Sequence, residues 1–192
     1  YDINDVEKIN EFCLKNNLPM HLDGARLFNA LVKNNDKASI WGGYFDSISL
    51  CFSKGLGTPM GSVLIGSKDF IHKARRVRKV LGGGMRQVGM VAAAGLYALE
   101  NNIDRLKKER NWMFDQLSKI NSVKVWPSEA NFFLIRLVEQ PGSLIFAQLK
   151  NKGFLVKNLT GSHPALMNCL RVTIGTREEN IGFLSALREL CH

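Results

Sequence analysis

The sequence has few cysteines, few prolines and no long apolar run, and each shortage excludes a class of protein. Its 192 residues include four cysteines and five prolines. The cysteines form no C-x-x-C pair and no Cys/His cluster with zinc spacing, so we expect neither a disulfide framework nor a metal site. No apolar stretch reaches about 18 residues, so we expect no membrane-spanning helix. Free thiols fit a reducing compartment, and we expect a cytoplasmic protein.

The composition is that of an ordinary globular protein. Hydrophobic residues make up 45% and charged residues 22% of the chain, which excludes disorder along its whole length. The chain opens at Tyr1, without a methionine and without a charged-then-apolar secretory leader. We therefore expect a trimmed or partial chain.

Positive charge is in excess, and this favours anionic ligands. The formal net charge is +9, which suits phosphorylated cofactors and carboxylate substrates. The densest basic stretch, 73–79, reads as the solvated face of a helix. It lacks interleaved aromatic residues and a known docking motif, so nucleic-acid binding is not favoured. No G-x-G-x-x-G or P-loop pattern is complete either.

Helical and strand patterns alternate along the first hundred residues. Helices are expected at 4–16, 68–80 and 85–100, and strands at 19–22, 46–51 and 62–65. Asn4 and Glu7 form a candidate cap pair for the first helix. This order predicts an α/β sheet domain over residues 1–100.

The pattern changes near residue 101, where we place a domain boundary. Apolar residues keep helical spacing over 101–120, long enough for a helix that bridges two domains. Strands are then expected at 123–126, 131–137, 154–156 and 169–174, with a helix at 141–152 between them. Thr176 and Glu179 form a capping box for a last helix. Residues 101–192 therefore predict a smaller α+β domain.

Three residues stand where chemistry is expected. Asp23 and Lys54 each sit just past the end of an apolar strand, and Arg171 lies inside one. Ligands of open α/β sheets bind beyond the carboxyl ends of strands, so one ligand could meet both Asp23 and Lys54. A desolvated lysine can attack an aldehyde, a buried aspartate can hold a pyridinium nitrogen protonated, and an arginine can bind a carboxylate. Together the three indicate a pyridoxal-phosphate (PLP) enzyme acting on an amino acid.

Each of the three residues also has an ordinary structural interpretation. Most loop lysines are solvated, Asp-Gly is a common turn, and an arginine in a strand is often ion-paired. Only the joint pattern favours catalysis.

Three blocks of the first part resemble low-specificity threonine aldolases. They are HLDGARLFNA at 21–30, DSISLCFSKGLGTPMGSV at 46–63 and LGGGMRQ at 81–87, and the likeness covers roughly residues 1–108. This resemblance implies a PLP-dependent fold of the aspartate-aminotransferase type. It also implies cleavage of threonine or allo-threonine to glycine and acetaldehyde.

The same resemblance assigns five residues to the cofactor. Lys54 would form the Schiff base with PLP, and Asp23 would pair with the pyridinium nitrogen. Ala25 would pack under the ring, and Ser53 would donate a hydrogen bond to the phosphate. Arg86 would lie near the site, in this subunit or in a neighbouring one, because this fold builds its sites across a dimer interface.

Three further residues would serve the substrate. Arg171 would bind the substrate carboxylate, and Arg26 would lie at that carboxylate or at the cofactor edge. His21 would tune the site or have a structural role; the sequence leaves both open.

The second part, 109–192, is similar to the small domain of histidinol-phosphate aminotransferases. The matching blocks are VWPSEANF at 125–132, GFLVKN at 153–158 and NCLRVTIGTREEN at 168–180. Both families carry a long segment before the equivalent of Tyr1. We therefore expect the C-terminal half of a PLP-dependent transferase fold, with about three strands left in its large sheet. A homo-oligomer, or a partner chain that supplies the first segment, would complete it.

Two other functions stay open beside the aldolase. One is an aminotransferase of the histidinol-phosphate type, in which Lys54 would also move a proton. The other is a non-catalytic fragment or interaction module.

Overall fold

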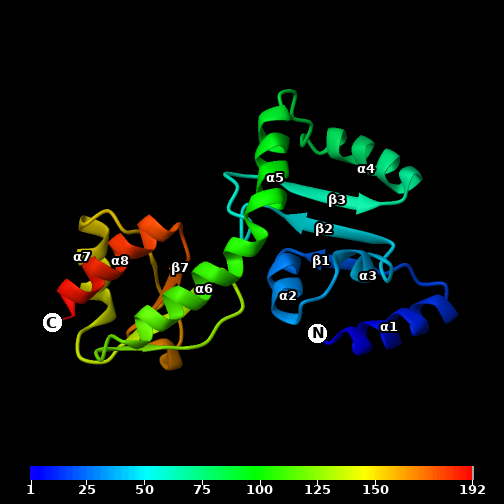
Figure 1. The fold of residues 1–192 in the computed structure, drawn as a ribbon. Coiled ribbons are helices and arrows are strands. Elements are labelled where there is room, and N and C mark those ends of the chain that lie inside the picture. Colours follow the sequence, from blue (N-terminus) through cyan, green and yellow to red (C-terminus); the bar gives the residue numbers. More distant parts are fainter. Residues whose placement is uncertain (192) are drawn as a thin grey trace. The chain divides into compact units, whose positions relative to one another are not determined.

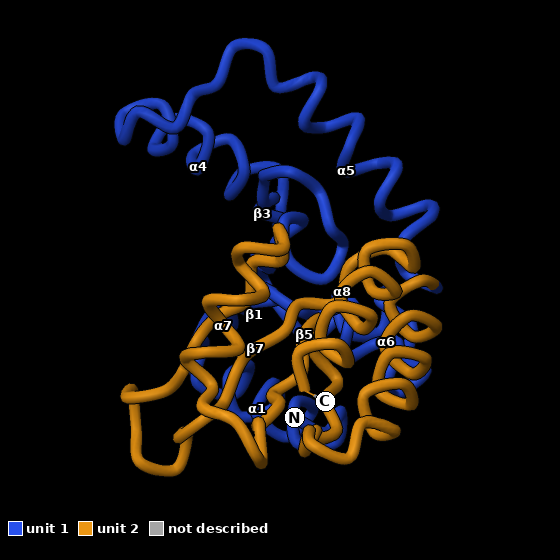
Figure 2. The backbone as a smooth tube through the Cα atoms, turned by 90° about the vertical axis from the view of Figure 1, so that its left-hand side faces the viewer, with its two compact units in different colours: residues 1–104 blue, residues 105–192 orange. Residues whose placement is uncertain are grey.

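The computed structural model describes residues 1–191, and the chain divides into two compact units (Figure 2). The first spans Tyr1–Asp104, and the second begins at Arg105. In the described residues, no helix combines the length and the apolar character needed to cross a membrane.

The first unit is built around a three-stranded sheet in the order β1-β2-β3 (Figure 1). β1 is parallel to β2, and β2 is antiparallel to β3. Its elements in chain order are α1 (Ile3–Lys15), β1 (His21–Gly24), α2 (Leu27–Asn34), α3 (Ala38–Gly42), β2 (Ser47–Cys51), β3 (Ser62–Gly66), α4 (Lys68–Val80) and α5 (Gly89–Asn101). Leu27 and Leu31 of α2 pack with Ile48 and Leu50 of β2 in the core of this unit. The three expected strands are therefore present.

Several details of the first unit differ from expectation. Asp2, not the pair Asn4 and Glu7, caps α1, because the Asp2 side chain accepts a hydrogen bond from the backbone N–H of Asn4. β1 runs through Gly24, so Asp23 lies within the strand and not past its end. α2 and α3 were not expected. α5 begins at Gly89 instead of 85, after a glycine-rich segment in which Gly82 adopts a left-handed φ of 78°.

The second unit has an antiparallel four-stranded sheet in the order β4-β5-β7-β6. Its elements are α6 (Ile103–Ser118), β4 (Val123–Val125), β5 (Phe132–Leu137), α7 (Gly142–Asn151), β6 (Lys157–Asn158), the 3-10 helix η1 (Pro164–Leu166), β7 (Cys169–Thr173) and α8 (Arg177–Leu190). Its core joins one face of the sheet to α6, α7 and α8 through Met113, Ile135, Leu149, Leu170 and Leu187, among others.

The strand expected at 154–156 is wrong. Phe154 and Val156 pack against the core and Leu155 is 80% exposed, which gives the alternation typical of a strand. Pairing with β7 begins only at Lys157, opposite Arg171. Residues 154–156 therefore show the alternating burial of a strand, although they form no hydrogen-bonded pair with β7.

Candidate active site

Two candidate residues share one edge of the first sheet. β1 and β2 run parallel with Asp23 opposite Ser49, so their carboxyl ends meet at the same edge. Asp23 is near the end of β1, and Lys54 follows three residues after β2 ends. Both side chains are exposed, so the expected buried acid and desolvated lysine are wrong for this structure. The Asp23 carboxylate accepts a hydrogen bond of 3.2 Å from the Ala25 N–H, which fixes it toward the turn that starts α2.

Gly24 lets the two strands approach closely beside Asp23. A Cβ at position 24 would lie 2.8 Å from the backbone oxygen of Ser49 and 3.0 Å from the Leu50 side chain. Real Cβ atoms do not approach a backbone oxygen so closely. The glycine is therefore required by the packing of β1 against β2.

We predict that Gly24→Ala lowers the free energy of unfolding by about 1–3 kcal/mol, the usual cost of overpacking. Thermal or urea denaturation measures this cost. Gly42→Ala is the matched control, because a Cβ there meets nothing within 4 Å. Equal free energies of unfolding for the two variants would contradict the requirement for glycine where β1 packs against β2.

The loop that carries Lys54 is held on two sides. On one side, the position of a Cβ on Gly55 is occupied by the Asn29 amide, which is buried in α2. On the other side, Leu56 is 2% exposed and its carbonyl accepts a hydrogen bond of 2.7 Å from the Asn102 side chain. Thr58 closes the loop with a backbone bond to Phe52. Lys54 thus projects from a fixed loop packed on α2.

Asn29 is a site residue that sequence reasoning did not single out. It lies inside the block 21–30, but its contact with Gly55 joins segments 26 residues apart. No periodicity or spacing marks such a contact. A buried polar residue on a short helix would have been the only signal.

The remaining candidates of the first unit are exposed or half-buried around these elements. His21 shares a 2.8 Å hydrogen bond with the Ser47 hydroxyl on the neighbouring strand, which supports a structural role. Arg26 is the residue before α2, and its carbonyl accepts hydrogen bonds from the first turn. The Ser53 hydroxyl lies 3.4 Å from the Cys51 sulfur. Arg86 is exposed in the segment between α4 and α5.

Arg171 belongs to the second unit, at the middle of β7. Its side chain is exposed, and its guanidinium lies 5.3 Å from the centre of the Phe132 ring. Leu170 and Val172 on either side are buried in the core. This alternation places Arg171 on the face of the sheet opposite the helices.

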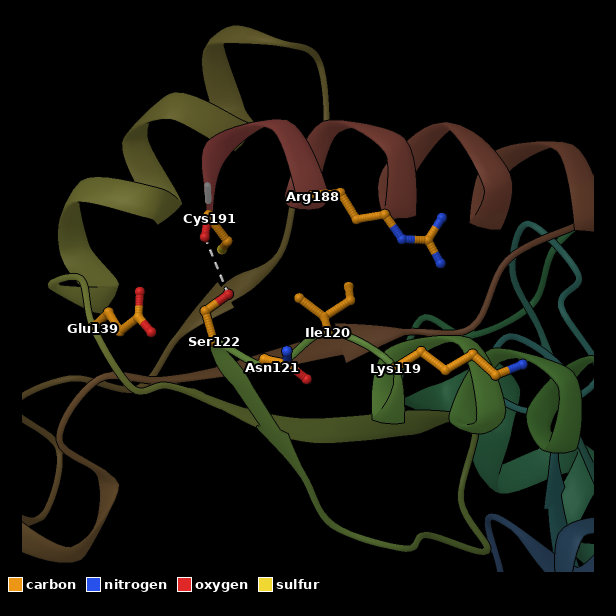
Figure 3. Close-up of a pocket in the computed structure, with 7 residues that line it drawn as sticks. All are labelled: Lys119, Ile120, Asn121, Ser122, Glu139, Arg188 and Cys191. Atoms are coloured by element: carbon orange, nitrogen blue, oxygen red, sulfur yellow. Dashed lines mark hydrogen bonds between the residues drawn. The ribbon is translucent and has the colours of Figure 1, made fainter.

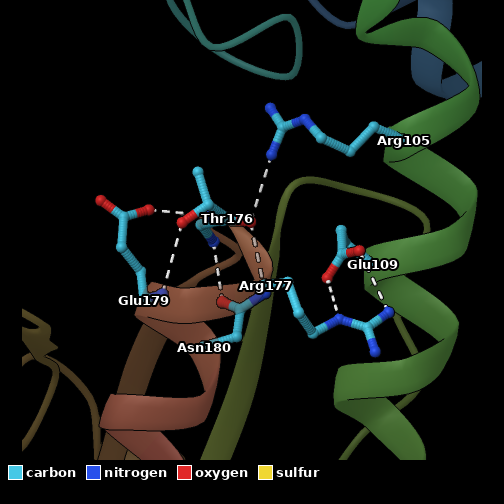
Figure 4. Close-up of polar contacts among 7 residues, drawn as sticks. Arg105, Glu109, Thr176, Arg177, Glu179 and Asn180 are labelled. Atoms are coloured by element: carbon cyan, nitrogen blue, oxygen red, sulfur yellow. Dashed lines mark hydrogen bonds and ion pairs between the residues drawn. The ribbon is translucent and has the colours of Figure 1, made fainter.

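A polar cluster fixes the end of β7 against α6 (Figure 4). The Arg105 guanidinium donates a hydrogen bond of 3.2 Å to the Gly175 carbonyl. The Asn180 side-chain amide also donates to that carbonyl, and its oxygen accepts a hydrogen bond from the Gly175 N–H. Arg177 makes two hydrogen bonds to the Glu109 carboxylate, at 2.9 and 3.1 Å, and its guanidinium lies 4.0 Å from the Trp112 ring centre. These contacts hold the strand that carries Arg171.

The expected capping box at the start of α8 is confirmed. The Thr176 hydroxyl accepts from the Glu179 N–H, and the Glu179 carboxylate accepts from the Thr176 N–H at 2.7 Å. The Thr176 backbone N–H, and then its side chain, lower the pKa of Glu179 below 4.5. Because the folded state favours the ionised carboxylate, this stabilisation is complete above pH 4.5 and is lost as the pH falls through the lowered value.

We predict that Thr176→Ala lowers the free energy of unfolding by about 1 kcal/mol at pH 7. Glu179→Gln keeps an acceptor but loses the charge, so its stability should fall below that of the parent at pH 7, and the difference should be smaller at pH 3. Urea denaturation at both pH values measures this. If the stability difference between the parent and Glu179→Gln is the same at pH 7 and pH 3, the Glu179 charge does not contribute as proposed.

A separate hollow of about 370 Å³ lies near the end of α8 (Figure 3). Its lining is Lys119, Ile120, Asn121, Ser122, Glu139, Arg188 and Cys191. None of the candidate residues lines it. Burial raises the pKa of the Cys191 thiol, so this hollow presents a protonated thiol and no thiolate nucleophile at neutral pH.

The residues at the shared sheet edge suit an aldehyde-bearing cofactor. Lys54 offers a primary amine, Asp23 a carboxylate and Ser53 a hydroxyl, and Ala25 beside Asp23 has a small side chain. Residues 1–191 contain no group of three His, Cys, Asp or Glu side chains placed to hold a metal ion.

Comparison with known proteins places the chain in a family. The profile of the beta-eliminating lyase family matches residues 1–140, beyond residue 108 where we expected the aldolase-like part to end. The low-specificity L-threonine aldolase of Escherichia coli K12 is 42% identical over 149 residues, which cover 76% of this chain and 44% of that protein. The chain thus spans about half the length of the curated relatives that it matches.

Solved structures show the same fold. The threonine aldolase of Leishmania major superposes with a TM-score of 0.68 at 20% identity, covering 100% of this chain and 57% of that one. The histidinol-phosphate aminotransferase of Clostridium acetobutylicum gives 0.63 at 18% identity, covering 98% and 59%. The chain has part of the fold of these proteins, and its matched residues show that it belongs to the beta-eliminating lyase family.

Proposed function

We propose that this chain carries the cofactor-binding lysine of a PLP-dependent lyase that cleaves threonine or allo-threonine into glycine and acetaldehyde. The observation that supports this most is the shared sheet edge, because parallel β1 ends just after Asp23 and β2 ends three residues before Lys54. The name and 42% identity of the Escherichia coli relative support the same activity.

In this proposal five residues hold PLP. Lys54 would hold the cofactor through its aldehyde carbon, and Asp23 would keep the ring nitrogen protonated. Ala25 packs under the ring, and Ser53 donates a hydrogen bond to the phosphate. Arg86 lies near the cofactor, in the same subunit or in a neighbouring one.

The remaining residues orient the substrate. PLP, when bound, supplies an electron sink for the bond that breaks. Arg171, and with it Arg26, binds the substrate carboxylate as a guanidinium fork, which sets the Cα–Cβ bond at the angle that cleavage needs. His21, through its hydrogen bond to the Ser47 hydroxyl, keeps the start of β1 in register with β2.

We further propose that the working protein is cytoplasmic and acts on a small amino acid. Its site would be completed in a homo-oligomer or with a partner chain, because this chain matches only part of the fold of its relatives. Edge strands β1 and β3 are where further strands would add, because the edges of a sheet carry unpaired backbone groups.

Product analysis tests this activity against the two alternatives. The protein is incubated with PLP and L-threonine or L-allo-threonine, and in parallel with an amino acid and a 2-oxo acid. We expect glycine and acetaldehyde in equal amounts from the first pair. Transfer of the amino group without glycine would establish the aminotransferase instead. If neither mixture yields a product, the result would favour the non-catalytic fragment or interaction module.

A further inference from the structure

The face of the second sheet that points away from its helices carries four basic side chains. Phe133, Ile135, Leu170 and Val172 point into the core. The neighbouring positions therefore point to the other side, since side chains alternate along a strand. This basic face consists of Lys124 on β4, Arg136 on β5, Arg171 on β7 and Lys157 on β6, with the rings of Trp126 and Phe132. β5 and β7 lie side by side at its centre (Figure 2).

The four cations form two like-charge pairs. Lys124 lies directly opposite Arg136, and Lys157 lies directly opposite Arg171. Like charges at opposed positions destabilise a sheet. A bound anion would offset the repulsion within these two pairs.

Acidic residues are absent from the four strands that carry these pairs. Within residues 1–191, the ion pairs of the second unit join Arg110, Lys119, Lys152 and Arg177 to acids, and none includes a cation of the basic face. The charge of the basic face is therefore available to a ligand.

Aromatic rings hold three of the cations in place. Lys124 and Arg136 lie 5.2 and 5.4 Å from the Trp126 ring centre, and Arg171 lies 5.3 Å from that of Phe132. Such contacts contribute attraction but leave the positive charge in place. Arg136 also donates to the Ala165 carbonyl, while its buried Nε has no hydrogen-bond partner in the described residues. These side chains are thus positioned before a ligand arrives.

We propose that the basic face binds a small organic bisphosphate, with one phosphate at the Lys157–Arg171 pair and the other at the Lys124–Arg136 pair. Arg136 pairs with Cys169, so Arg171 is its diagonal neighbour, at roughly 7–8 Å between the Cα atoms. Two separate phosphates fit this spacing better than one. Arginine forks and lysine ammonium groups are the usual partners of phosphate. The site shares Arg171 with the proposed function, so a bound bisphosphate should compete with the substrate carboxylate for that guanidinium.

Trp126 provides a direct readout for this binding. The full chain is titrated with fructose 1,6-bisphosphate while tryptophan fluorescence is followed, and fructose 6-phosphate is the single-phosphate comparison. We expect the bisphosphate to bind at least about 10-fold more tightly, since its second phosphate adds charge-assisted contacts that the single phosphate lacks. Trp126→Phe should remove most of the signal while calorimetry still detects binding.

Matched double variants locate the site. Lys124→Gln with Lys157→Gln should weaken bisphosphate binding about 10-fold or more. Lys107→Gln with Lys150→Gln removes the same charge from exposed positions on α6 and α7 and should leave binding unchanged. Equal loss in both double variants, equal affinity for the two sugar phosphates, or no binding would overturn the proposal.

Two further measurements distinguish bisphosphate binding from nucleic-acid binding and from the lyase activity. Tighter binding of a ten-nucleotide single-stranded DNA than of the bisphosphate would show a nucleic-acid surface instead and would also overturn the proposal. Glycine release from threonine should persist in the Lys124 and Lys157 double variant, because neither residue holds PLP or the substrate carboxylate. Failure of the bisphosphate site therefore leaves the proposed lyase activity intact, and the reverse holds too.

Discussion

Replacing Lys54 with alanine is expected to lower the release of glycine from L-threonine by about 10³-fold or more. In the proposed function, the Lys54 amine is the only group of this chain that bonds the cofactor aldehyde, and loss of such a nucleophile removes nearly all catalysis. The effect should appear in kcat, because the substrate-binding arginines are unchanged. Coupled detection of glycine and acetaldehyde in the parent and the variant measures it.

Lys33→Ala is the matched control for this experiment. Lys33 is an exposed lysine on α2, in the same unit, and has no role in the proposed site. Its variant should retain parental activity. Comparable glycine release by the Lys54→Ala protein would exclude Lys54 as the cofactor-binding residue.

Adding one methyl group at Gly55 is expected to disable the site while leaving most of the fold intact. In Gly55→Ala, the new Cβ would collide with the Asn29 amide, which is 5% exposed and enclosed by the core of the first unit. The loop cannot retreat on its other side, because Leu56 is buried and bonded to Asn102. We expect a loss of about 1–3 kcal/mol in stability and at least about 10-fold weaker PLP binding, since Lys54 is the neighbouring residue.

Shortening Asn29 should restore the stability and the PLP affinity that Gly55→Ala removes. The double variant Gly55→Ala with Asn29→Ala opens the space that the methyl group needs. A double-mutant cycle on PLP affinity and on the midpoint of urea denaturation measures the coupling. Additive losses at the two positions would contradict the contact between the Lys54 loop and α2.

The sequence predicted those parts of the fold that local patterns determine. The capping box of Thr176 and Glu179 and the helix at 68–80 depend on residues within a few turns of one another, and both are confirmed. β2 and β3 are short segments rich in Ile, Leu and Val and lie within one residue of their expected bounds. The family resemblance, carried by three ordered blocks, is confirmed as well.

Features set by contacts distant in sequence were not predictable in this way. β1 extends through Asp23 because it pairs with β2, and β6 is displaced from 154–156 because pairing with β7 fixes its register. The contact between Asn29 and Gly55 and the assembly of the basic face from four strands depend on the same long-range pairing. The exposure of Asp23 and Lys54 also depends on what covers the sheet edge, which no local pattern encodes.

The most direct test of the account is to identify the lysine that PLP labels. The purified chain is titrated with PLP, treated with borohydride to fix the bound cofactor, digested, and analysed by mass spectrometry, beside the Lys54→Ala variant. We predict saturable labelling of one peptide, modified at Lys54 and absent from the variant digest. Labelling spread over surface lysines, or equal in both proteins, would contradict the claim that the loop after β2 holds the cofactor.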